Sequence, residues 1–336
     1  MRLVLLTALL LGGLLGIAAP RAAGKRPPKP RPVPIIFDTD IGPDVDDAGA
    51  AAILNALADL GEAKILVMVC CTSSEWGPPC LDAINTYYGR PDVPIGTFQG
   101  KGFLTGSRYN EQVARQFPND LRSAKNAEEA TALYRRLLKG QRNHSVVICV
   151  TGPLNNLAAL LRSPGEAGNK LTGADLVKKK VRLLVVMGGA FPRGVEFNFR
   201  SDAAATARVC LDWPTPILFS GFEIGSRIMT GARLAAETPE SNPVRAAFRF
   251  YNGGKNRQSW DETAILAAVR GPNSHWKTSP SGSTLANSKT GENHWSPMPE
   301  RGHFYLIERD PPADVARAIE DLMVRPPKLA SRPGKQ

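Results

Sequence analysis

Short hydrophobic runs alternate with longer amphipathic segments along most of the chain. The runs predict β-strands at Val33–Phe37, Ala63–Cys71, Val93–Ile95, Ser145–Val150, Val181–Met187 and Pro216–Ser220. The amphipathic segments predict helices at Asp47–Leu60, Pro79–Tyr88, Ala127–Lys139, Leu154–Arg162, Ala203–Leu211, Glu262–Arg270 and Asp314–Met323. Strands that are hydrophobic throughout and alternate with helices are typical of a parallel sheet. The pattern therefore predicts an α/β fold with an open, mostly parallel, Rossmann-like sheet and helices on both faces.

Two segments carry more local signals. Asn126, with Glu129 three residues later, resembles a capping box and predicts the start of the helix Ala127–Lys139. The segment Gly271–Gly302 is rich in Gly, Ser, Asn and Pro, which predicts a long loop or an irregular hairpin.

The two ends of the chain are expected to lie outside this fold. Arg2 precedes the hydrophobic run Leu3–Ala19, and small residues follow, which is the layout of a cleaved export signal. A membrane anchor is the alternative, but the run is slightly shorter than the ~20 residues of a membrane span, and Pro20 interrupts it. We expect a signal peptide at 1–23, a basic Pro-rich linker at 24–33, a domain at 34–326 and a disordered tail at 327–336. The protein would then be secreted or periplasmic, with no stable membrane insertion after signal cleavage.

Charge and cysteine content narrow the function classes. The net charge is +11, but the sequence has no basic stripe with interleaved aromatic residues, so nucleic-acid binding is not favoured. The five cysteines form no dense framework and no CxxC pair. Cys70, Cys71 and Cys149 lie in hydrophobic runs, which predicts buried thiols. Export would permit one disulfide, for which Cys80 is a candidate.

Five aspartates follow the first predicted strand: Asp38, Asp40, Asp44, Asp46 and Asp47. Asp38 and Asp40 are two residues apart, so they would share one face of an extended strand. Asp46 and Asp47 lie where a helix is expected to begin, and capping by Asp47 is the structural alternative. Capping explains one or two carboxylates, whereas five close together would repel one another. The cluster therefore predicts a Ca²⁺ or Mg²⁺ site at the carboxyl ends of the strands.

One hydrolase class fits this segment only in part. Phosphatases of the haloacid dehalogenase type have an apolar strand that ends in DxDx[TV], which "IIFDTDIG" resembles. Ile41 and Gly42 follow Asp40 here, and the acidic pair comes almost at once, so the fit is poor. Such a phosphatase would require Mg²⁺ and would lose turnover on Asp38→Asn substitution.

Four blocks of sequence resemble the calcium-dependent nucleoside hydrolase family, of the inosine/uridine-preferring kind. "DTDIGPDVDDAGA" is similar to the family's DxDxGxDDxxA signature, with two extra residues before the DD pair. "VTGPLNNLAALL", "VVMGGAF" with "VEFNFRSDAAAT", and "SWDETAILAAV" resemble its later blocks in the same order. The resemblance extends from Pro34 to Arg325 and is thin across Gly96–Asn143 and Gly271–Gly302.

The resemblance implies hydrolysis of the N-glycosidic bond of ribonucleosides by a water bound to Ca²⁺. The metal ligands would be Asp40, Asp47, the main-chain carbonyl of Thr151, and Asp261, with Asp40 also the catalytic base. The substrate contacts would include Asp46, Glu196, Asn198 and Met187, and Asn198 would also help to polarise the sugar. Carboxylates suit this chemistry because positive charge develops on the sugar as the base departs. Taken singly, Thr151 or Asp261 could instead cap a helix, and Asn198 could be a turn residue.

The sequence departs from the family pattern in two places that concern substrate binding. Some members have a His before the late aspartate, whereas this chain has Trp260. Stacking on Trp260, with Trp76 as a second aromatic face, would favour purine nucleosides, although ordinary packing explains either Trp equally well. The stretch Phe191–Val195 is shorter than usual in the family.

Two classes of function remain. The first is an exported nucleoside hydrolase, which by resemblance could be a homo-oligomer and whose partner is a small-molecule nucleoside. The second is a calcium-stabilised binding protein that has the metal site but no chemistry. Release of a base from a nucleoside distinguishes them.

Overall fold

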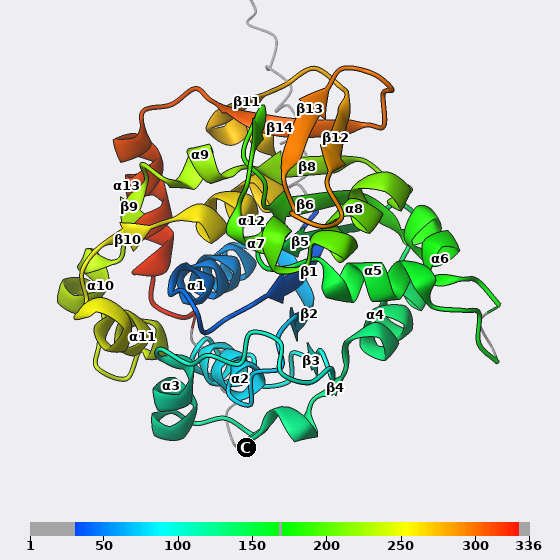
Figure 1. Ribbon diagram of the computed structural model, residues 1–336. Coiled ribbons are helices and arrows are strands. Elements are labelled where there is room, and N and C mark those ends of the chain that lie inside the picture. The colour runs from blue at the N-terminus through cyan, green and yellow to red at the C-terminus, as the bar shows by residue number, and fades with distance from the viewer. Residues whose placement is uncertain (1–30, 168–169, 329–336) are drawn as a thin grey trace, which may run out of the picture. The chain divides into compact units, whose positions relative to one another are not determined.

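A nine-stranded sheet forms the centre of the computed structural model, which describes residues 31–167 and 170–328 (Figure 1). The strands lie in the order β11-β14-β8-β6-β5-β1-β2-β3-β4. All neighbours are parallel except β11 and β14. Their bounds are β1 Val33–Thr39, β2 Ala63–Cys70, β3 Ile95–Thr97, β4 Glu128–Glu129, β5 Val146–Val150, β6 Val181–Met187, β8 Ile217–Ser220, β11 Trp276–Thr278 and β14 His303–Glu308. The predicted mostly parallel α/β sheet is confirmed.

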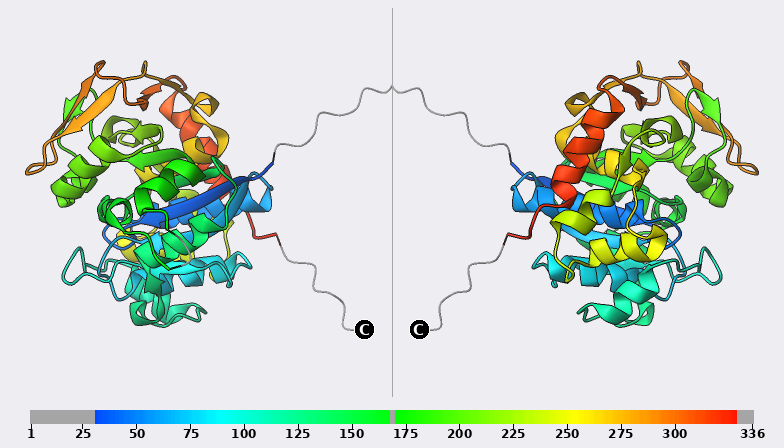
Figure 2. Two further views of the ribbon diagram at one scale, coloured as in Figure 1. Left: turned by 90° about the vertical axis from the view of Figure 1, so that its right-hand side faces the viewer. Right: turned by 90° about the vertical axis from the view of Figure 1, so that its left-hand side faces the viewer.

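Helices cover both faces of this sheet, because alternate side chains of each central strand point to opposite sides. In β1, Ile35 and Phe37 pack into one core and Ile36 into the other. The first core is shared with α1 Asp46–Asp59, α2 Gly77–Tyr87, α3 Asn110–Gln116, α11 Pro243–Asn252, α12 Trp260–Arg270 and α13 Pro312–Met323. The second is shared with α4 Ala130–Lys139, α5 Asn155–Arg162, α6 Gly173–Lys180 and α8 Ala203–Asp212. In the left panel of Figure 2 the green helices face the viewer, and in the right panel red α13 faces the viewer.

The remaining elements are short. They are the helices α7 Phe197–Ser201, α9 Phe222–Gly225, α10 Ala232–Glu237, η1 Ala124–Asn126 and η2 Pro272–Ser274, and the strands β7 Arg193–Gly194, β9 Met229–Thr230, β10 Arg257–Gln258, β12 Ser283–Ala286 and β13 Asn293–Ser296. Strands β12 and β13 pair antiparallel, which confirms the irregular hairpin within Gly271–Gly302. The predicted capping box is wrong, because Glu129 itself is the N-cap of α4 and accepts from the main-chain N–H of Ala132.

The strand order places a switch point at the carboxyl end of β1. The chain passes from β1 to β2 on one side, and β5 pairs with β1 on the other. Ligands of open parallel sheets bind at such a point, where the loops after neighbouring strands diverge.

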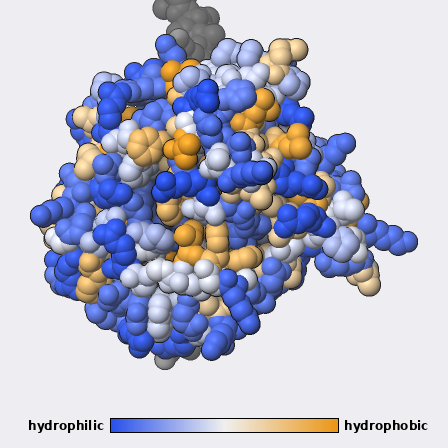
Figure 3. All heavy atoms as spheres, in the orientation of Figure 1, coloured by the Kyte–Doolittle hydropathy of each residue, from blue (hydrophilic) through white to orange (hydrophobic). Residues whose placement is uncertain are grey.

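Several predictions concern the ends of the chain and the cysteines. The predicted signal peptide, most of the linker and most of the tail lie outside the described residues, and their assignments stay predictions. All five cysteines are free and buried, so the disulfide considered for Cys80 is not formed. None of the described helices is both long and apolar enough to cross a membrane. On the face drawn in Figure 3, hydrophobic residues form small separate areas among hydrophilic ones.

Candidate active site

Two glycines allow the loops at the carboxyl ends of β1 and β5 to meet around Asp40. Gly42 turns the chain after Asp40 with φ 144°, a backbone conformation that favours glycine, and a Cβ there would lie 2.5 Å from Asn110 Nδ2. A Cβ on Gly152, in the loop after β5, would lie 2.9 Å from the main-chain nitrogen of Asp40. A side chain on Gly152 would therefore separate Asp40 from the loop that carries Thr151, whereas one on Gly42 would collide with Asn110.

Helix α1 begins directly after this turn and presents two buried carboxylates. Its N-cap is Val45, without a side-chain hydrogen bond, so capping by Asp47 is wrong. Instead, the hydroxyl of Thr39 donates to Asp47 Oδ1, and that of Thr151 donates to the same oxygen at 3.3 Å. Asp46 Oδ2 accepts hydrogen bonds from the main-chain N–H groups of Trp260 and Asp261, at 3.2 and 3.3 Å. Asp46 thereby joins the start of α1 to the start of α12.

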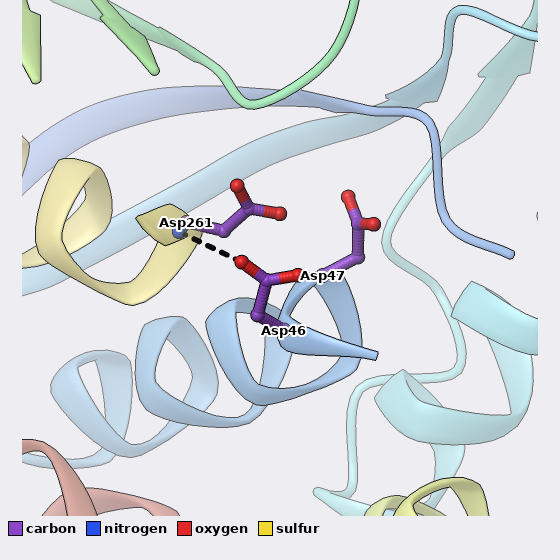
Figure 4. A group of neighbouring side chains, drawn as sticks. All are labelled: Asp46, Asp47 and Asp261. Atoms are coloured by element: carbon purple, nitrogen blue, oxygen red, sulfur yellow. Dashed lines mark hydrogen bonds between the residues drawn. The ribbon is translucent and has the colours of Figure 1, made fainter. Parts of the chain in front are cut away.

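A group of three buried carboxylates results from this junction (Figure 4). Asp46, Asp47 and Asp261 each contribute one carboxylate oxygen, and these three oxygens lie within 4.8 Å of one another. Burial raises the pKa of all three well above the usual range, and the negative charges of neighbouring carboxylates raise it further. An oxygen-only set whose negative charges face one another fits a hard divalent cation such as Ca²⁺.

Asp40 is not one of these three residues, but its negative charge raises the pKa of each of them, and it faces the same cavity. Burial raises the pKa of Asp40 to about 7, with a further contribution from the negative charges of Glu196 and Asp44. The prediction had placed Asp40 among the metal ligands and Asp46 with the substrate. The compact group of oxygens contains Asp46 instead, because the N–H groups at the start of α12 hold its carboxylate beside Asp261.

Asp38 points elsewhere, so the prediction that it shares a face with Asp40 is wrong. Strand β1 ends at Thr39, and the alternation of faces does not continue to Asp40. The hydroxyl of Tyr134 donates to Asp38 Oδ2 at 2.8 Å, and the amide of Asn156 donates to the same oxygen at 3.1 Å. Asp38 is fully buried and does not line the cavity.

The cavity has a volume of about 450 Å³, which is within the ordinary range of small-molecule sites. Its lining combines acidic, basic and aromatic side chains. The lining residues are Asp40, Pro43, Asp44, Asp46, Asp47, Arg108, Thr151, Met187, Val195, Glu196, Phe197, Asn198, Arg200, Phe222, Tyr251, Arg257, Trp260 and Asp261. The structure thus brings together every predicted site residue except Trp76.

The segment between β6 and the end of α7 supplies five of these residues, Val195, Glu196, Phe197, Asn198 and Arg200. The carboxylate of Glu196 accepts from the main-chain N–H groups of Gly189, Asn198 and Phe199, so it also caps the short helix α7. The Asn198 amide donates to the carbonyls of Thr151, at 3.1 Å, and Met187, at 3.2 Å. Asn198 is therefore held by the carboxyl ends of two strands and is not a simple turn residue.

The alternatives of helix capping by Thr151 and Asp261 are also wrong. The N-cap of α5 is Leu154, without a side-chain hydrogen bond. Asp261 is the second residue of α12, whose N-cap is Ser259. Both polar side chains face the cavity instead.

Aromatic side chains lie at one side of the cavity. Trp260 stacks on Phe222 with ring centroids 5.4 Å apart, and its indole N–H donates to the Phe222 carbonyl at 2.8 Å. Phe222 and Phe197 expose nearly half of their surface, 48% and 43%. Trp76 lies away from the cavity under the guanidinium of Arg115, which is 4.4 Å from the Trp76 ring. Trp76 therefore provides no second aromatic face at the cavity, and Phe222 extends the aromatic surface of Trp260.

Sequence reasoning missed several lining residues that carry charge or a hydroxyl. Arg257 forms an ion pair with Asp44, with Nε 3.0 and 3.1 Å from the two carboxylate oxygens. Arg108 donates to the hydroxyl of Tyr251 at 3.0 Å. Arg257 is three residues before Trp260 and could have been found beside that block, whereas Arg108 lies where the resemblance is thin.

The chain is similar to known proteins in sequence and in fold. The family model described as inosine-uridine preferring nucleoside hydrolase matches residues 35–320. A plant nucleoside hydrolase, PpNRh1, matches with TM-score 0.63 and 18% identity over 88% of this chain and 100% of its own. The inosine-uridine preferring nucleoside hydrolase from Bacillus anthracis matches with TM-score 0.64 and 15% identity over 87% and 99%.

A third solved structure is of a different kind of protein. It is the type III effector protein XopQ complexed with adenosine diphosphate ribose, which matches with TM-score 0.63 and 14% identity over 89% of this chain and 94% of its own. At these identities the solved structures support the fold alone. The search of curated proteins gave no match.

Proposed function

Since the chain belongs to the inosine-uridine preferring nucleoside hydrolase family, whose enzymes are N-glycosyl hydrolases of nucleosides, we propose that it cleaves ribonucleosides with Ca²⁺ as cofactor and prefers purine bases. The observation that carries the proposal is the buried group of Asp46, Asp47 and Asp261 at a cavity that also has stacking aromatic side chains. Membership of this family and the enclosed position of Asp38 exclude the phosphatase alternative.

The residues that would hold Ca²⁺ are Asp47, Asp261, Asp40 and the carbonyl of Thr151, with Asp46 beside them. When bound, the ion would supply positive charge that orients the ribose diol and makes a water proton more acidic. The Thr151 carbonyl already accepts from the Asn198 amide. A carbonyl oxygen has two lone pairs, so this hydrogen bond would fix its direction without preventing a second contact.

Asp40 would accept the proton of the attacking water. It is buried beside the acidic group and faces the cavity, which a general base requires. Asp46 and Glu196 would add negative charge near the sugar ring, where positive charge develops as the bond to the base breaks. Asn198 would contribute its amide dipole from a position that the Thr151 and Met187 carbonyls fix.

The base would stack in the aromatic part of the cavity. Trp260 and Phe222 provide a large apolar surface at its edge, and a purine offers more stacking area than a pyrimidine. Trp260 cannot donate from its indole nitrogen to the leaving base while that N–H is bonded to Phe222. We therefore assign Trp260 a stacking role.

Export to the periplasm or the medium completes the proposal, and it rests on the sequence of residues 1–23. An enzyme in that location would act on extracellular nucleosides. The protein would then serve to scavenge bases or ribose.

Base release from inosine, adenosine, guanosine, uridine and cytidine tests the proposal, with Ca²⁺ and with chelator. We expect release that requires Ca²⁺, is faster for purines and is lost in Asp40→Asn. Asp92→Asn, at an exposed position outside the cavity, is the matched control and should keep full activity. If Ca²⁺ raises the melting temperature but no nucleoside loses its base, the protein is a calcium-stabilised binding protein instead.

A further inference from the structure

The acidic cavity is also lined by three arginines, which differ in how their charge is balanced. Arg257 is half-buried and paired with Asp44, and its guanidinium lies 5.2 Å from the Trp260 ring centroid. Its charge is therefore matched by a neighbouring carboxylate. Arg108 and Arg200 are exposed, and neither forms an ion pair with any carboxylate in the described part of the chain.

Arg108 is held in place by an aromatic residue. Its guanidinium lies 4.0 Å from the Tyr251 ring centroid and donates to the Tyr251 hydroxyl at 3.0 Å. Its main-chain N–H donates to the carbonyl of Gly42, in the turn after Asp40. These contacts use one of the five guanidinium N–H groups, so the others can bind a ligand at the cavity.

Arg200 reaches the cavity from helix α7. It is two residues after Asn198, and its main-chain N–H donates to the carbonyl of Glu196. Its guanidinium lies 5.7 Å from the ring centroid of Phe197, which also lines the cavity. The backbone that positions the proposed sugar contacts therefore positions this cation as well.

We propose that the substrate carries a phosphate on ribose C5′, which Arg108 and Arg200 bind at the cavity, so that a nucleoside 5′-monophosphate is hydrolysed in preference to the free nucleoside. The inference rests on the proposed function. The C5′ substituent lies on the opposite face of the ribose ring from the 2′ and 3′ hydroxyls, so the two can bind different parts of one site. Guanidinium groups match the geometry and charge of a phosphate, whereas carboxylates repel it. Arg108 and Arg200 have no carboxylate partners, whereas the three-carboxylate group lies elsewhere in the same cavity. This distribution of charge suits a substrate that carries negative charge at one end only.

The reaction leaves the phosphate unchanged. The bond between C1′ and the base nitrogen breaks, and its electron pair goes to the base, which takes up a proton. A bond from the water oxygen to C1′ forms, and the water keeps one proton in the new C1′ hydroxyl and gives the other to Asp40. Asp40 then returns this proton to the solvent, from which the base takes up its own, so the net reaction adds one water across the broken bond. The products are the free base and ribose 5-phosphate, with no oxidation or reduction.

Kinetics of the full chain in saturating Ca²⁺ test the proposal with two substrates, inosine 5′-monophosphate and inosine. We expect a higher kcat/KM for the monophosphate. Arg108→Gln and Arg200→Gln should each lower its kcat/KM by ~10–100-fold, because each removes a charged hydrogen-bond donor, and should lower that of inosine far less. Arg162→Gln is the matched control, an exposed arginine outside the cavity, and should leave both values unchanged.

The outcomes separate this inference from the function on which it rests. Faster hydrolysis of inosine than of its monophosphate, with equal effects of the two arginine variants on both, overturns the phosphate site and keeps the nucleoside hydrolase. Where neither substrate loses its base, calorimetric titration of the same two compounds decides. Tighter binding of the monophosphate that both variants weaken then retains the phosphate site without hydrolysis, and equal binding rejects both proposals.

Discussion

Asp38 and Asp47 are both buried aspartates near the end of β1, but their surroundings differ. Asp38 meets two neutral donors, the hydroxyl of Tyr134 and the amide of Asn156. Asp47 accepts from the hydroxyls of Thr39 and Thr151 but also faces Asp46 and Asp261. Burial raises the pKa of both groups, yet repulsion from neighbouring carboxylates is a leading cause only for Asp47.

This difference separates a structural carboxylate from one that fits a cation. Donors from α4 and α5 satisfy Asp38, so a positive ion has nothing to add there. The carboxylates at the junction of α1 and α12 have too few donors to balance their mutual repulsion. A buried aspartate near a strand end is therefore a metal-ligand candidate only where other carboxylates face it.

The largest expected effect comes from Asp47→Asn, which removes one charge from the three-carboxylate group and keeps the shape of the side chain. We expect nucleoside hydrolysis to fall by at least ~100-fold, together with the affinity for Ca²⁺. Loss of even a hydrogen-bond partner of a metal ligand lowers metal affinity or activity by ~10–100-fold. Base release and calorimetric Ca²⁺ titration measure the two losses. Unchanged Ca²⁺ affinity would place the ion elsewhere.

Calcium itself should stabilise the folded chain by ~2.7 kcal/mol at a free concentration 100 times its Kd. The reason is that only the folded chain brings Asp46 and Asp47 to within reach of Asp261. Thermal unfolding of the chelated protein with increasing Ca²⁺ measures the effect as a rise in Tm. The Asp47→Asn variant serves as the control and should show little rise, and an equal rise in that variant contradicts the comparison.

Asp38→Asn should cost stability and spare the chemistry. The amide nitrogen that replaces one carboxylate oxygen would face the donors Tyr134 or Asn156, at an expected cost of ~1–3 kcal/mol. Urea unfolding measures this cost, and Ca²⁺-dependent base release should stay within a few-fold of the unchanged enzyme. Tyr134→Phe is the matched variant and should cost ~1 kcal/mol by removal of one hydrogen bond. Complete loss of hydrolysis in folded Asp38→Asn would show that Asp38, like Asp47, is needed for the reaction.

The smallest expected effect comes from His303, a buried residue whose imidazole accepts one hydrogen bond. Its Nδ1 accepts from the main-chain N–H of Thr284 at 3.0 Å, and burial, with the nearby charge of Arg301, lowers the pKa of His303 to about 4. The unfolded chain takes up this proton at a higher pH, so His303 lowers the free energy of unfolding as pH falls from about 6.5 to about 4.

A comparison with His303→Gln isolates that contribution. The variant should unfold with a shallower dependence on pH over this range, by at most one proton, because glutamine can accept from Thr284 without titrating. Urea unfolding at several pH values measures both slopes, and the contributions of all other groups cancel. Equal slopes would show that His303 takes up its proton in the folded state as readily as in the unfolded one.

The sheet was predictable because its central strands are mostly hydrophobic, as in Val181–Met187, where prediction and structure coincide and Arg182 is the one charged residue. Helices α3, α6 and α11 were missed. They have only 7, 8 and 10 residues, so each shows few turns of the hydrophobic periodicity by which a helix is recognised. The orientation of Asp38 was predicted wrongly because the alternation rule was applied one residue beyond the end of the strand. Local sequence specifies how a strand alternates better than where it stops.

The site was predictable where its residues lie in blocks of recognisable spacing, such as Asp46, Asp47 and Asp261. Arg108 and Tyr251 were not, because their relation depends on the packing of a loop against α11, 143 residues further along the chain. The presence of Phe222 at the cavity, and the absence of Trp76 from it, have the same origin. Both residues follow strands of the sheet, and only the three-dimensional course of their loops decides which one reaches the cavity.

The hydrogen bonds from the N–H groups of Trp260 and Asp261 to Asp46 span 214 and 215 residues of sequence. This separation sets an order for the biosynthesis of the site. The first two carboxylates leave the ribosome early, and the third follows only after three-quarters of the chain has been made. A nascent chain that stops before α12 therefore lacks Asp261 and the two N–H groups that hold Asp46, and it cannot form the three-carboxylate group.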